Sequence, residues 1–426
     1  MRVEPAAAIV GAVAVPGVKG ICQRGVLLGA VAEGESELRG FGHAGDTDAA
    51  IRVVRTLGAT VDEPEPDVVR IKGLGLHGLR EPAGPIDCGN AGTVLRLVAG
   101  ILAGQSGRFE LTGDASLSAR PVRVEEPLSQ MGARVETTNG RPPVVVEGAA
   151  LRPIRYELPA ASAQVKSSVL LAGVLARDGP TTVVEPLPTR DHTERMLSAL
   201  GVHVSRQGNE ISVRPVDRLP PLSLEIPGDF SSAAPFVVAA TLLSGSELIV
   251  RGVNVNPTRT GLLAVLARMG ARITVFNRRL VGGEPTADLE VREAELVATS
   301  IGPEEVPLLV DELPLFALAA GSARGESVVT GASELRVKET DRIESVTNAL
   351  RALGVRIVAT DDGFRVRGVP TRPRGGGVRS EGDHRIAMLG AVAGVVSREG
   401  VEIEDTEAAA VSFPGFFELL DSVSQR

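Results

Sequence analysis

Basic side chains recur where an apolar helix is expected to begin. PGVKGICQR, SAQVKSSVLLAG and GDHRIAM each place a cation or an amide at the start of such a run. Helix starts attract anions because their first N–H groups lack intrahelical partners and the helix dipole is positive there. The candidate cations are Lys19, Arg24, Arg120, Arg190, Lys338, Arg342 and Arg385. In an acidic chain, this set predicts a site that binds small anions.

Two candidate proton-transfer groups accompany these cations. Asp311 lies in VDELPLF, and Glu339 lies in RVKETDR beside Lys338 and Arg342. Guanidinium groups suit phosphate and carboxylate, whereas Asp and Glu can move protons. The i, i+4 spacing of Lys338 and Arg342 predicts a shared helical face, with Glu339 pointing elsewhere. The implied reaction is proton transfer between anionic small molecules, although each segment alone is equally consistent with a surface cluster of salt bridges.

Several other chemistries lack their motifs. GxxxxGK[ST], HExxH, GxSxG and the EF-hand loop are all absent, which argues against a Walker A phosphate loop, metal hydrolysis and a serine nucleophile. The two cysteines, Cys22 and Cys88, form neither a CxxC metal motif nor a disulfide framework. We therefore expect no metal and no disulfide.

A repeated unit must position these groups. An apolar helix-like run, a glycine turn and a β-rich run recur six times, with turn glycines at Gly34, Gly104, Gly179, Gly245, Gly325 and Gly400. A second signature, a helix ending in Gly before a β-branched run, follows five of them: RTLGATV, SQMGARV, SALGVHV, ARMGARI and RALGVRI. Glycine after a helix adopts the left-handed conformation that other residues avoid. The pattern predicts six α/β units, three in each of two domains.

Composition narrows the function classes. The 426 residues are 43% hydrophobic and carry a formal net charge of −8, with 10 Phe, one Tyr and no Trp. An acidic chain with few aromatic rings is a poor nucleic-acid binder. Without an apolar stretch of about 20 residues, no transmembrane helix is expected. We expect a cytoplasmic protein that binds neither nucleic acid nor membrane.

The ordered motifs resemble the 5-enolpyruvylshikimate-3-phosphate synthase (3-phosphoshikimate 1-carboxyvinyltransferase) family of enolpyruvyl transferases. The resemblance runs from PGVKGICQR through GNAGTVLR, LTGDASLSARP, SAQVKSS, TRDHTERM, PGDFSSAA and RVKETDR to GDHRIAM and SFPGFF. It implies a two-domain inside-out α/β barrel of six βαβαββ-type repeats, with the active site in the interdomain cleft. One lobe, at 16–226, would bind mainly shikimate 3-phosphate. The other, 1–15 plus 227–426, would contribute mainly phosphoenolpyruvate-binding and proton-transfer residues.

The resemblance also implies the reaction. Phosphoenolpyruvate and shikimate 3-phosphate would give 5-enolpyruvylshikimate 3-phosphate and phosphate through a tetrahedral intermediate, in the chorismate route to aromatic amino acids. By motif position, shikimate 3-phosphate would be bound by Lys19, Gly20, Arg24, Ser162, Ala163, Gln164, Arg190, Asp311 and Lys338. Phosphoenolpyruvate would be bound by Lys19, Gly92, Arg120, Gln164, Arg342 and Arg385.

Catalytic roles follow from the same resemblance. Asp311 would take the proton of the attacking 5-hydroxyl, and Glu339 with Lys19 would handle protons at the methylene carbon. The family implies no cofactor and a monomer. Because Gly92 leaves room that an alanine side chain would fill, we expect glyphosate to inhibit the enzyme in the phosphoenolpyruvate site.

The first motif departs from the family pattern. PGDKSISHR is replaced by PGVKGICQR, so that Val18, Gly20, Cys22 and Gln23 stand for Asp, Ser, Ser and His. The family serine at the position of Gly20 donates its hydroxyl to the shikimate phosphate, and glycine has none. Backbone or water would have to substitute, at a cost of about 1–2 kcal/mol for one hydrogen bond. We expect weaker binding of shikimate 3-phosphate, which Gly20→Ser should reverse.

Three alternatives remain at this point. Enolpyruvyl transfer to a different hydroxylated acceptor would explain Gly20. Transfer to UDP-N-acetylglucosamine typically uses a catalytic cysteine in the loop that here reads LSARP, and neither Cys22 nor Cys88 lies there. A non-catalytic anion-binding relative would have lost proton-transfer groups that this chain keeps.

Overall fold

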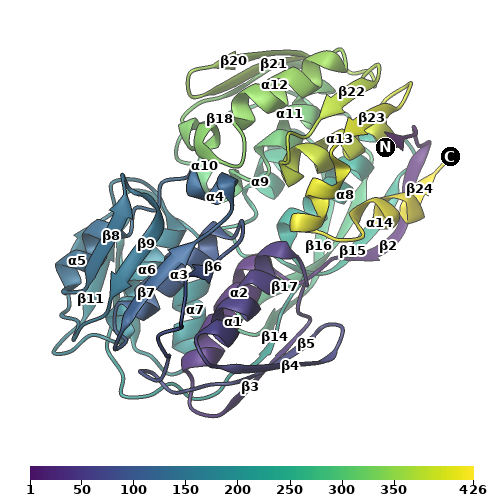
Figure 1. The fold of residues 1–426 in the computed structure, drawn as a ribbon. Helices are drawn as coiled ribbons and strands as arrows, with labels where there is room; N and C mark the ends of the chain where they lie inside the picture. Colours follow the sequence, from purple (N-terminus) through teal and green to yellow (C-terminus); the bar gives the residue numbers. More distant parts are fainter. The chain divides into compact units, whose positions relative to one another are not determined.

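The chain folds into two compact units, and the computed structural model describes every residue from Met1 to Arg426 (Figure 1). Unit 1 comprises Met1–Pro16, Pro227–Leu280 and Pro285–Arg426. Unit 2 comprises Gly17–Ile226 together with the short segment Val281–Glu284. Unit 2 is therefore inserted into the sequence of unit 1. Each unit mixes helices with sheets.

Unit 2 contains the chemistry-bearing helix starts of the first half of the chain. Its helices are α1 (Lys19–Val31), α2 (Gly45–Thr56), α3 (Gly92–Leu102), α4 (Ala115–Ser118), α5 (Glu125–Met131), α6 (Ala163–Val174) and α7 (His192–Ala199). Its strands are β3 (Glu35–Arg39), β4 (Thr60–Glu65), β5 (Val68–Lys72), β6 (Ile86–Asp87), β7 (Arg108–Thr112), β8 (Arg134–Thr138), β9 (Arg141–Glu147), β10 (Arg155–Glu157), β11 (Thr181–Val184), β12 (Val204–Gln207), β13 (Glu210–Val213) and β14 (Ser223–Glu225).

These strands form three four-stranded sheets with one shared plan. Their orders are β14-β3-β5-β4, β6-β7-β9-β8 and β10-β11-β13-β12. In each sheet the first pair is parallel and the other two pairs are antiparallel. A parallel pair needs a crossover connection, and β6–β7 and β10–β11 obtain theirs from α3 and α6.

Unit 1 contains the remaining elements. Its helices are α8 (Phe230–Leu242), α9 (Gly261–Arg268), α10 (Val306–Leu309), α11 (Leu313–Gly321), α12 (Arg342–Ala352), α13 (His384–Val396) and α14 (Phe416–Val423), with 3₁₀ turns η1 (Ser333–Val337) and η2 (Thr406–Val411). Its strands are β1 (Arg2–Val3), β2 (Ala8–Ala14), β15 (Glu247–Asn254), β16 (Arg272–Val281), β17 (Glu284–Arg292), β18 (Ser300–Ile301), β19 (Gly325–Val329), β20 (Arg356–Thr360), β21 (Gly363–Gly368), β22 (Gly376–Arg379), β23 (Val401–Glu404) and β24 (Ser424–Gln425).

The sheets of unit 1 join distant parts of the sequence. One repeats the plan of unit 2 in the order β18-β19-β21-β20, and the others run β16-β17-β15-β2-β24 and β1-β23-β22. Strand β2 pairs in parallel with β15 and antiparallel with β24. The N-terminal segment is thus held in unit 1 by partners that lie far along the chain.

The helix–glycine–strand signature is confirmed in all five copies. Its glycines have positive φ, from 81° to 111°, between α2 and β4, α5 and β8, α7 and β12, α9 and β16, and α12 and β20. L-residues with a Cβ are strained there, so glycine ends each helix and turns the chain into the strand. This repeated turn sets where each following strand begins.

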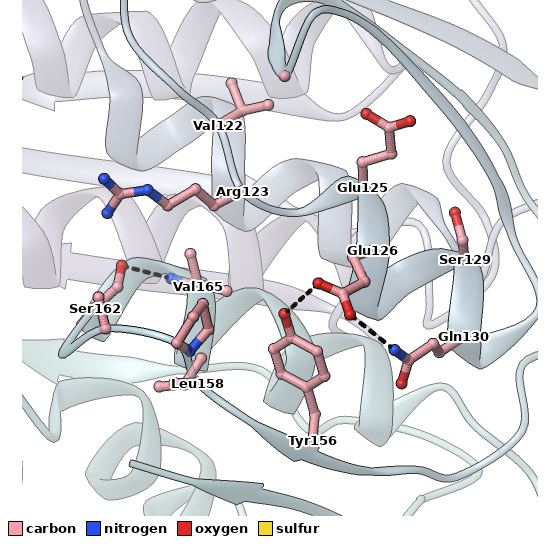
Figure 2. Close-up of a pocket in the computed structure, with 13 residues that line it drawn as sticks. Val122, Arg123, Glu125, Glu126, Ser129, Gln130, Tyr156, Leu158, Ser162 and Val165 are labelled. Carbon is pink, nitrogen blue, oxygen red and sulfur yellow. Dashed lines mark hydrogen bonds between the residues drawn. The ribbon is translucent and has the colours of Figure 1, made fainter. Parts of the chain in front are cut away.

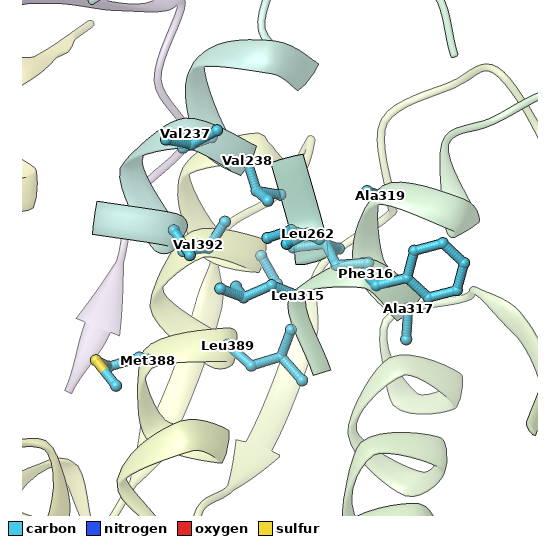
Figure 3. Packing of buried hydrophobic residues seen from close by; sticks show 14 of the residues in the cluster. Val237, Val238, Leu262, Leu315, Phe316, Ala317, Ala319, Met388, Leu389 and Val392 are labelled. Carbon is cyan, nitrogen blue, oxygen red and sulfur yellow. The ribbon is translucent and has the colours of Figure 1, made fainter. Parts of the chain in front are cut away.

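Buried helices support the site in both units. Almost every residue of α8, α11 and α13 is buried, and Figure 3 shows Val238, Leu315 and Leu389 meeting in the core of unit 1. In unit 2, a Cβ on Gly100 of α3 would lie 2.2 Å from the carbonyl oxygen of Ser168 in α6. Glycine therefore permits the close approach of α3 and α6 at this point.

Candidate active site

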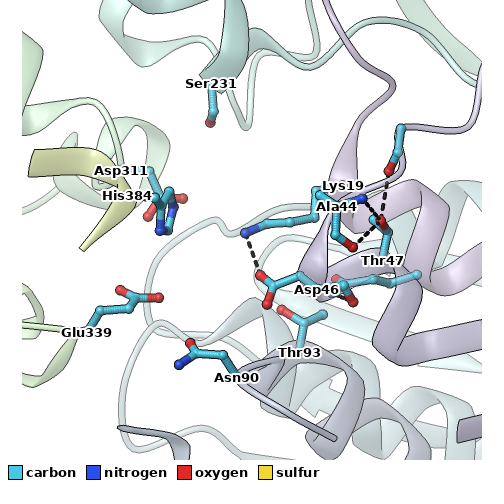
Figure 4. Close-up of polar contacts among 12 residues, drawn as sticks. Lys19, Ala44, Asp46, Thr47, Asn90, Thr93, Ser231, Asp311, Glu339 and His384 are labelled. Carbon is cyan, nitrogen blue, oxygen red and sulfur yellow. Dashed lines mark hydrogen bonds and ion pairs between the residues drawn. The ribbon is translucent and has the colours of Figure 1, made fainter. Parts of the chain in front are cut away.

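Helix α1 begins at the predicted lysine. Val18 provides no side-chain cap, so the first N–H groups of α1 have the anion-attracting character that the sequence predicts. Lys19 Nζ lies 2.7 Å from Asp46 Oδ2, as Figure 4 shows. The lysine side chain is 26% exposed, which leaves it accessible to a ligand.

Arg24 is buried one turn farther along α1. Its Nε donates to Thr193 Oγ1 at 2.6 Å, Nη2 to Ser167 Oγ at 2.9 Å and Nη1 to the carbonyl oxygen of Gly20 at 2.8 Å. These acceptors belong to α1, α6 and α7. Arg24 therefore fixes three predicted site segments to one another within unit 2.

The starts of α3 and α6 meet through a residue absent from the predicted set. Arg96 donates from Nη1 to Gln164 Oε1 at 2.5 Å and to the carbonyl oxygen of Gly92 at 3.1 Å. Gln164 Nε2 donates to Thr93 Oγ1 at 2.8 Å, while Ser162 caps α6 through the N–H of Val165. The structure thus brings Gly92, Ser162, Ala163 and Gln164 together, with Arg96 as the link.

Arg120 is aligned by the loop before α3. Its Nη2 donates to the main-chain oxygen of Asn90 at 2.9 Å and to Asn90 Oδ1 at 2.7 Å. A Cβ on Gly92 would lie 2.9 Å from Arg96 Nη1 and 3.8 Å from Arg120 Nη1. The missing side chain at Gly92 therefore lets two guanidinium groups converge at the start of α3.

Arg190 and its neighbours occupy the loop before α7. Arg190 lies two residues ahead of His192, the first residue of α7. The imidazole of His192 is buried, and its Nδ1 lies 2.7 Å from Glu284 Oε1. This histidine–carboxylate pair was not among the predicted site residues.

In unit 1, the predicted base lies between two arginines. Asp311 Oδ2 accepts from Arg259 Nη1 at 3.5 Å, and Asp311 Oδ1 accepts from Arg342 Nη1 at 3.5 Å. Arg259 is buried and also donates to Asp229 Oδ1 and Ser231 Oγ. Burial opposes the charge of Arg259, but Asp229, Glu312 and Asp311 outweigh it and raise the pKa of the guanidinium. Arg259 was missed in the sequence.

Arg342 is the centre of the second part of this network. Its Nε donates to Asp383 Oδ2 at 2.7 Å and its Nη2 to Glu339 Oε2 at 2.6 Å. Although burial disfavours both charges, their attraction raises the pKa of Arg342 and lowers the pKa of the Asp383 carboxyl. Asp383 also caps α13 by accepting from the N–H of Arg385. The carboxylate thus holds two predicted arginines in place.

The predicted helical face at RVKETDR is wrong. Lys338 ends the 3₁₀ turn η1 with an extended ψ of −157°, and α12 begins only at Arg342. Asp341 caps α12, accepting from the N–H groups of Ile343 and Glu344, so the segment from Lys338 to Asp341 is a loop. Glu339 therefore turns back to contact Arg342. Burial is the main cause that lowers the pKa of the Lys338 ammonium.

Arg385 combines burial with an unsatisfied donor. Its Nη1 donates to the carbonyl oxygen of Ser231 at 3.2 Å, while its buried Nε has no hydrogen-bond partner. Ser231 Oγ donates to Glu312, whose burial raises the pKa of its carboxyl. Because an unpaired buried donor is costly, Arg385 is suited to an anionic ligand. Ser231 and Glu312 extend the site beyond the predicted residues.

A cavity of about 680 Å³ in unit 2 adjoins only one predicted residue, Ser162 (Figure 2). Tyr156 donates to Glu126 there at 3.2 Å, and burial is the main cause that raises the pKa of its hydroxyl to about 12. Two carboxylates, Glu125 and Glu126, line its wall against one cation, Arg123, so the wall favours an anionic substrate less than the helix starts do. We therefore place the anion site at the helix starts and not in this cavity.

The structure contains neither a cluster of metal-ligating side chains nor a helix that could span a membrane. No group of three or more His, Cys, Asp or Glu side chains is arranged to hold a metal ion. No helix combines the length and apolar character needed to cross a bilayer.

Comparison with known proteins relates this geometry to one family. A family model described as EPSP synthase (3-phosphoshikimate 1-carboxyvinyltransferase) matches residues 3–420. Proteins named 3-phosphoshikimate 1-carboxyvinyltransferase include one from Alkalilimnicola ehrlichii, 49% identical over 98% of this chain and 94% of its own. Another, from Acidithiobacillus ferrooxidans, is 49% identical over 97% of this chain and 95% of its own.

Solved structures of similar fold include an EPSP synthase and another enolpyruvyl transferase. EPSP synthase from Acinetobacter baumannii superimposes with a TM-score of 0.88 at 41% identity, covering 99% of this chain and 98% of that one. The enolpyruvyl transferase NikO from Streptomyces tendae has a TM-score of 0.79 at 16% identity, covering 99% and 96%. The second comparison concerns the fold alone, which is mixed α/β in each case.

Proposed function

The chain belongs to the EPSP synthase family, and from this premise we propose that it transfers the enolpyruvyl group of phosphoenolpyruvate to the 5-hydroxyl of shikimate 3-phosphate. The products are 5-enolpyruvylshikimate 3-phosphate and phosphate, in the biosynthesis of aromatic compounds. The observation that carries the proposal is the cluster of buried or aligned arginines at helix starts. Two anionic substrates require several fixed positive groups if they are to approach each other.

In this proposal the six sheets correspond to six repeats, three in each lobe. Each lobe is built from three of these repeats, as the inside-out α/β barrel of the family implies. The lobe at 16–226 binds mainly shikimate 3-phosphate, and the lobe of 1–15 with 227–426 contributes mainly phosphoenolpyruvate-binding and proton-transfer residues. The shared strand order of four sheets supports the repeat assignment.

The substrate contacts follow the helix starts. Shikimate 3-phosphate binds at Lys19, Gly20, Arg24, Ser162, Ala163, Gln164, Arg190, Asp311 and Lys338. Phosphoenolpyruvate binds at Lys19, Gly92, Arg120, Gln164, Arg342 and Arg385. The unsatisfied Nε of Arg385 and the convergence of guanidinium groups at Gly92 support the second set.

The chemistry is an addition followed by an elimination. Asp311 accepts the proton of the 5-hydroxyl while the hydroxyl oxygen of shikimate 3-phosphate bonds to C2 of phosphoenolpyruvate. In the same step, Glu339 with Lys19 delivers a proton to the methylene carbon of phosphoenolpyruvate. In the second step, phosphate leaves C2 while a proton is removed from the methyl group, restoring the double bond. Arg259 and Arg342 hold Asp311 as a carboxylate acceptor, which supports its role as the base.

The rival activities have less support. Cys88 is fully buried, and burial is the main cause that raises the pKa of its thiol to about 12, so it cannot serve as a ready nucleophile. Cys22 is also buried. Gly20 alone favours a different hydroxylated acceptor, and retention of the proton-transfer groups disfavours a non-catalytic relative.

The deciding experiment measures phosphate release from phosphoenolpyruvate in the presence of shikimate 3-phosphate. Parallel reactions contain UDP-N-acetylglucosamine or no acceptor. Release that depends on shikimate 3-phosphate is the expected result. If no phosphate is released with shikimate 3-phosphate, although calorimetry shows that phosphoenolpyruvate still binds, shikimate 3-phosphate is excluded as the acceptor.

We also propose that the protein is a cytoplasmic monomer and a glyphosate target. A Cβ on Gly92 would lie 2.9 Å from Arg96 Nη1, so this position bears directly on the donor site. Millimolar glyphosate should slow turnover competitively with phosphoenolpyruvate, and Gly92→Ala should raise the concentration needed. An uninhibited wild-type enzyme would refute this part of the proposal.

A further inference from the structure

The cavity of unit 2 has a floor that favours an apolar ligand. Its volume of about 680 Å³ is within the range of sites that hold small organic molecules. The buried side chains that line it are Val122, Tyr156, Leu158 and Val165, from the segment before α5, from β10 and the loop after it, and from α6. An apolar group gains about 25 cal/mol for each Å² that it removes from water. The floor can therefore bind the apolar body of a small molecule.

One carboxylate of the cavity wall is held in place beside this floor. Glu126 Oε2 accepts from the Tyr156 hydroxyl at 3.2 Å, and Glu126 Oε1 accepts from Gln130 Nε2 at 3.2 Å, as Figure 2 shows. Because burial raises the pKa of the Tyr156 hydroxyl to about 12, the phenol keeps its proton and remains a donor to Glu126. A carboxylate offers about four acceptor sites, so Glu126 retains about two for a ligand.

The charges of the wall favour a positive ligand group. Glu125 and Glu126 lie in the first turn of α5, and both accept from neutral donors, Glu125 from the Thr137 hydroxyl. Arg123 is the one cation of the wall, and Figure 2 shows its guanidinium on the side of the cavity away from Glu126. A phosphate or carboxylate would face two like charges at α5, whereas an ammonium group would meet acceptors of opposite charge.

We propose that this cavity is a second ligand site, which binds a small organic amine with its ammonium group on Glu126 and its apolar body against Tyr156 and Leu158. Ser162 is the one residue that the cavity shares with the predicted anion site. The inference does not depend on the proposed function, because it rests on the floor and wall of the cavity alone.

The chain carries its own probe of this cavity. Tyr156 is the single tyrosine, and the sequence contains no tryptophan. Fluorescence excited in the tyrosine absorption band therefore comes from the cavity floor. A ligand that contacts Tyr156 should change this emission without any label or substitution.

Fluorescence titration tests the site with probes that differ in one feature each. 2-Phenylethylamine has the ammonium group and an apolar ring, 2-phenylethanol lacks the charge, 3-phenylpropionate reverses it and ethylamine lacks the ring. We expect saturable binding of 2-phenylethylamine with an affinity about 10-fold or more above that of 2-phenylethanol, as for a hydrogen bond to a charged group. 3-Phenylpropionate and ethylamine should bind more weakly than 2-phenylethylamine. Calorimetry repeats each titration, so that binding without a change in emission is also detected.

Three variants assign the binding to the cavity. Glu126→Gln removes the charge but keeps an acceptor for the Tyr156 hydroxyl, so it should abolish the preference for the amine over the alcohol. Glu157→Gln is the matched control and should keep that preference, because Glu157 follows Tyr156 on β10 but is exposed and lies outside the lining. Ser129→Phe places a ring on the cavity wall and should weaken the binding of both probes. Thermal melting followed by circular dichroism checks that each variant is folded.

Three outcomes would overturn the inference: no binding of 2-phenylethylamine to the wild type, equal affinities for the amine and the alcohol, or a preference that survives Glu126→Gln. These titrations contain neither phosphoenolpyruvate nor shikimate 3-phosphate. The proposed function and this inference can therefore fail independently of each other.

Discussion

Three site arginines of unit 2 donate to neutral oxygens of that unit, whereas two site arginines of unit 1 donate to carboxylates of theirs. In unit 2, Arg24, Arg96 and Arg120 donate to hydroxyl, amide and main-chain carbonyl oxygens. In unit 1, Arg259 and Arg342 donate to carboxylates, among them Asp311 and Asp383. Neutral acceptors orient a guanidinium and leave its charge in place, whereas carboxylates neutralise it and stiffen the network.

This difference in acceptors indicates that the site arginines of the two units have different roles. In unit 2 the neutral acceptors align guanidinium donors in a geometry that suits phosphate groups. In unit 1, Arg259 and Arg342 hold carboxylates in place, including that of the predicted base Asp311. Arg385 differs, because its Nη1 donates to the carbonyl oxygen of Ser231 and its buried Nε has no hydrogen-bond partner, which keeps unit 1 able to bind an anion.

The largest loss of stability and of kcat/KM is expected when a carboxylate that pairs with a unit 1 arginine is removed. Asp383→Asn takes away the carboxylate that Arg342 Nε contacts at 2.7 Å and leaves this buried cation with only Glu339 and Asp311 as carboxylate partners. Breaking one half of a buried pair costs about 3–5 kcal/mol of stability. We expect kcat/KM for phosphate release to fall by about 100-fold, roughly the factor given by about 2.7 kcal/mol of lost transition-state stabilisation. Urea unfolding and initial rates measure the two quantities, and a loss below tenfold would contradict the charge-holding role.

A smaller effect is expected for the matching change in unit 2. Asn90→Ala removes the Oδ1 acceptor of Arg120 and keeps the main-chain acceptor. Loss of one neutral hydrogen bond costs about 0.5–1.5 kcal/mol, so the KM for phosphoenolpyruvate should rise roughly two- to tenfold with little change in stability. Gln207→Ala, on an exposed strand residue, is the control. A collapse as severe as that of Asp383→Asn would remove the distinction between the units.

The smallest effect concerns the pH profile. Burial lowers the pKa of Lys338, so its ammonium loses its proton, and with it the attraction for a phosphate, at a lower pH than an ordinary lysine. The alkaline fall of kcat/KM for shikimate 3-phosphate should therefore begin early, and Lys338→Arg should move it to higher pH. Rates near neutral pH should change little. If kcat/KM falls at the same alkaline pH in wild type and in Lys338→Arg, the fall is caused by a group other than Lys338.

Local signals allowed the helix starts and helix ends to be predicted. The five glycines with positive φ follow from short motifs, and Lys19 opens helix α1 as expected. Arg96, Arg259 and Glu312 could not be found in this way because their roles depend on partners brought in by the fold. Arg96 meets Gln164 across 68 residues, and Glu312 meets Ser231 across 81.

The error at RVKETDR has a local cause that the sequence does contain. Asp341 is a favourable N-cap directly before Arg342, and it starts α12 there. The i, i+4 argument assumed a helix that already included Lys338. A cap residue inside a charged segment is thus stronger evidence for a helix boundary than side-chain spacing is for a helix.

The position of β2 has a consequence for biosynthesis. On the ribosome, all but the short Val281–Glu284 segment of unit 2 emerges before most of unit 1 exists, so unit 2 can begin folding during translation. Strand β2 is made early, yet its partners are β15 and, near the end of the chain, β24. An unpaired apolar strand is prone to aggregate, and this one must wait until the main segment of unit 2 has been made before β15 can pair with it. The nascent chain is therefore a natural client for chaperones that shield exposed strands.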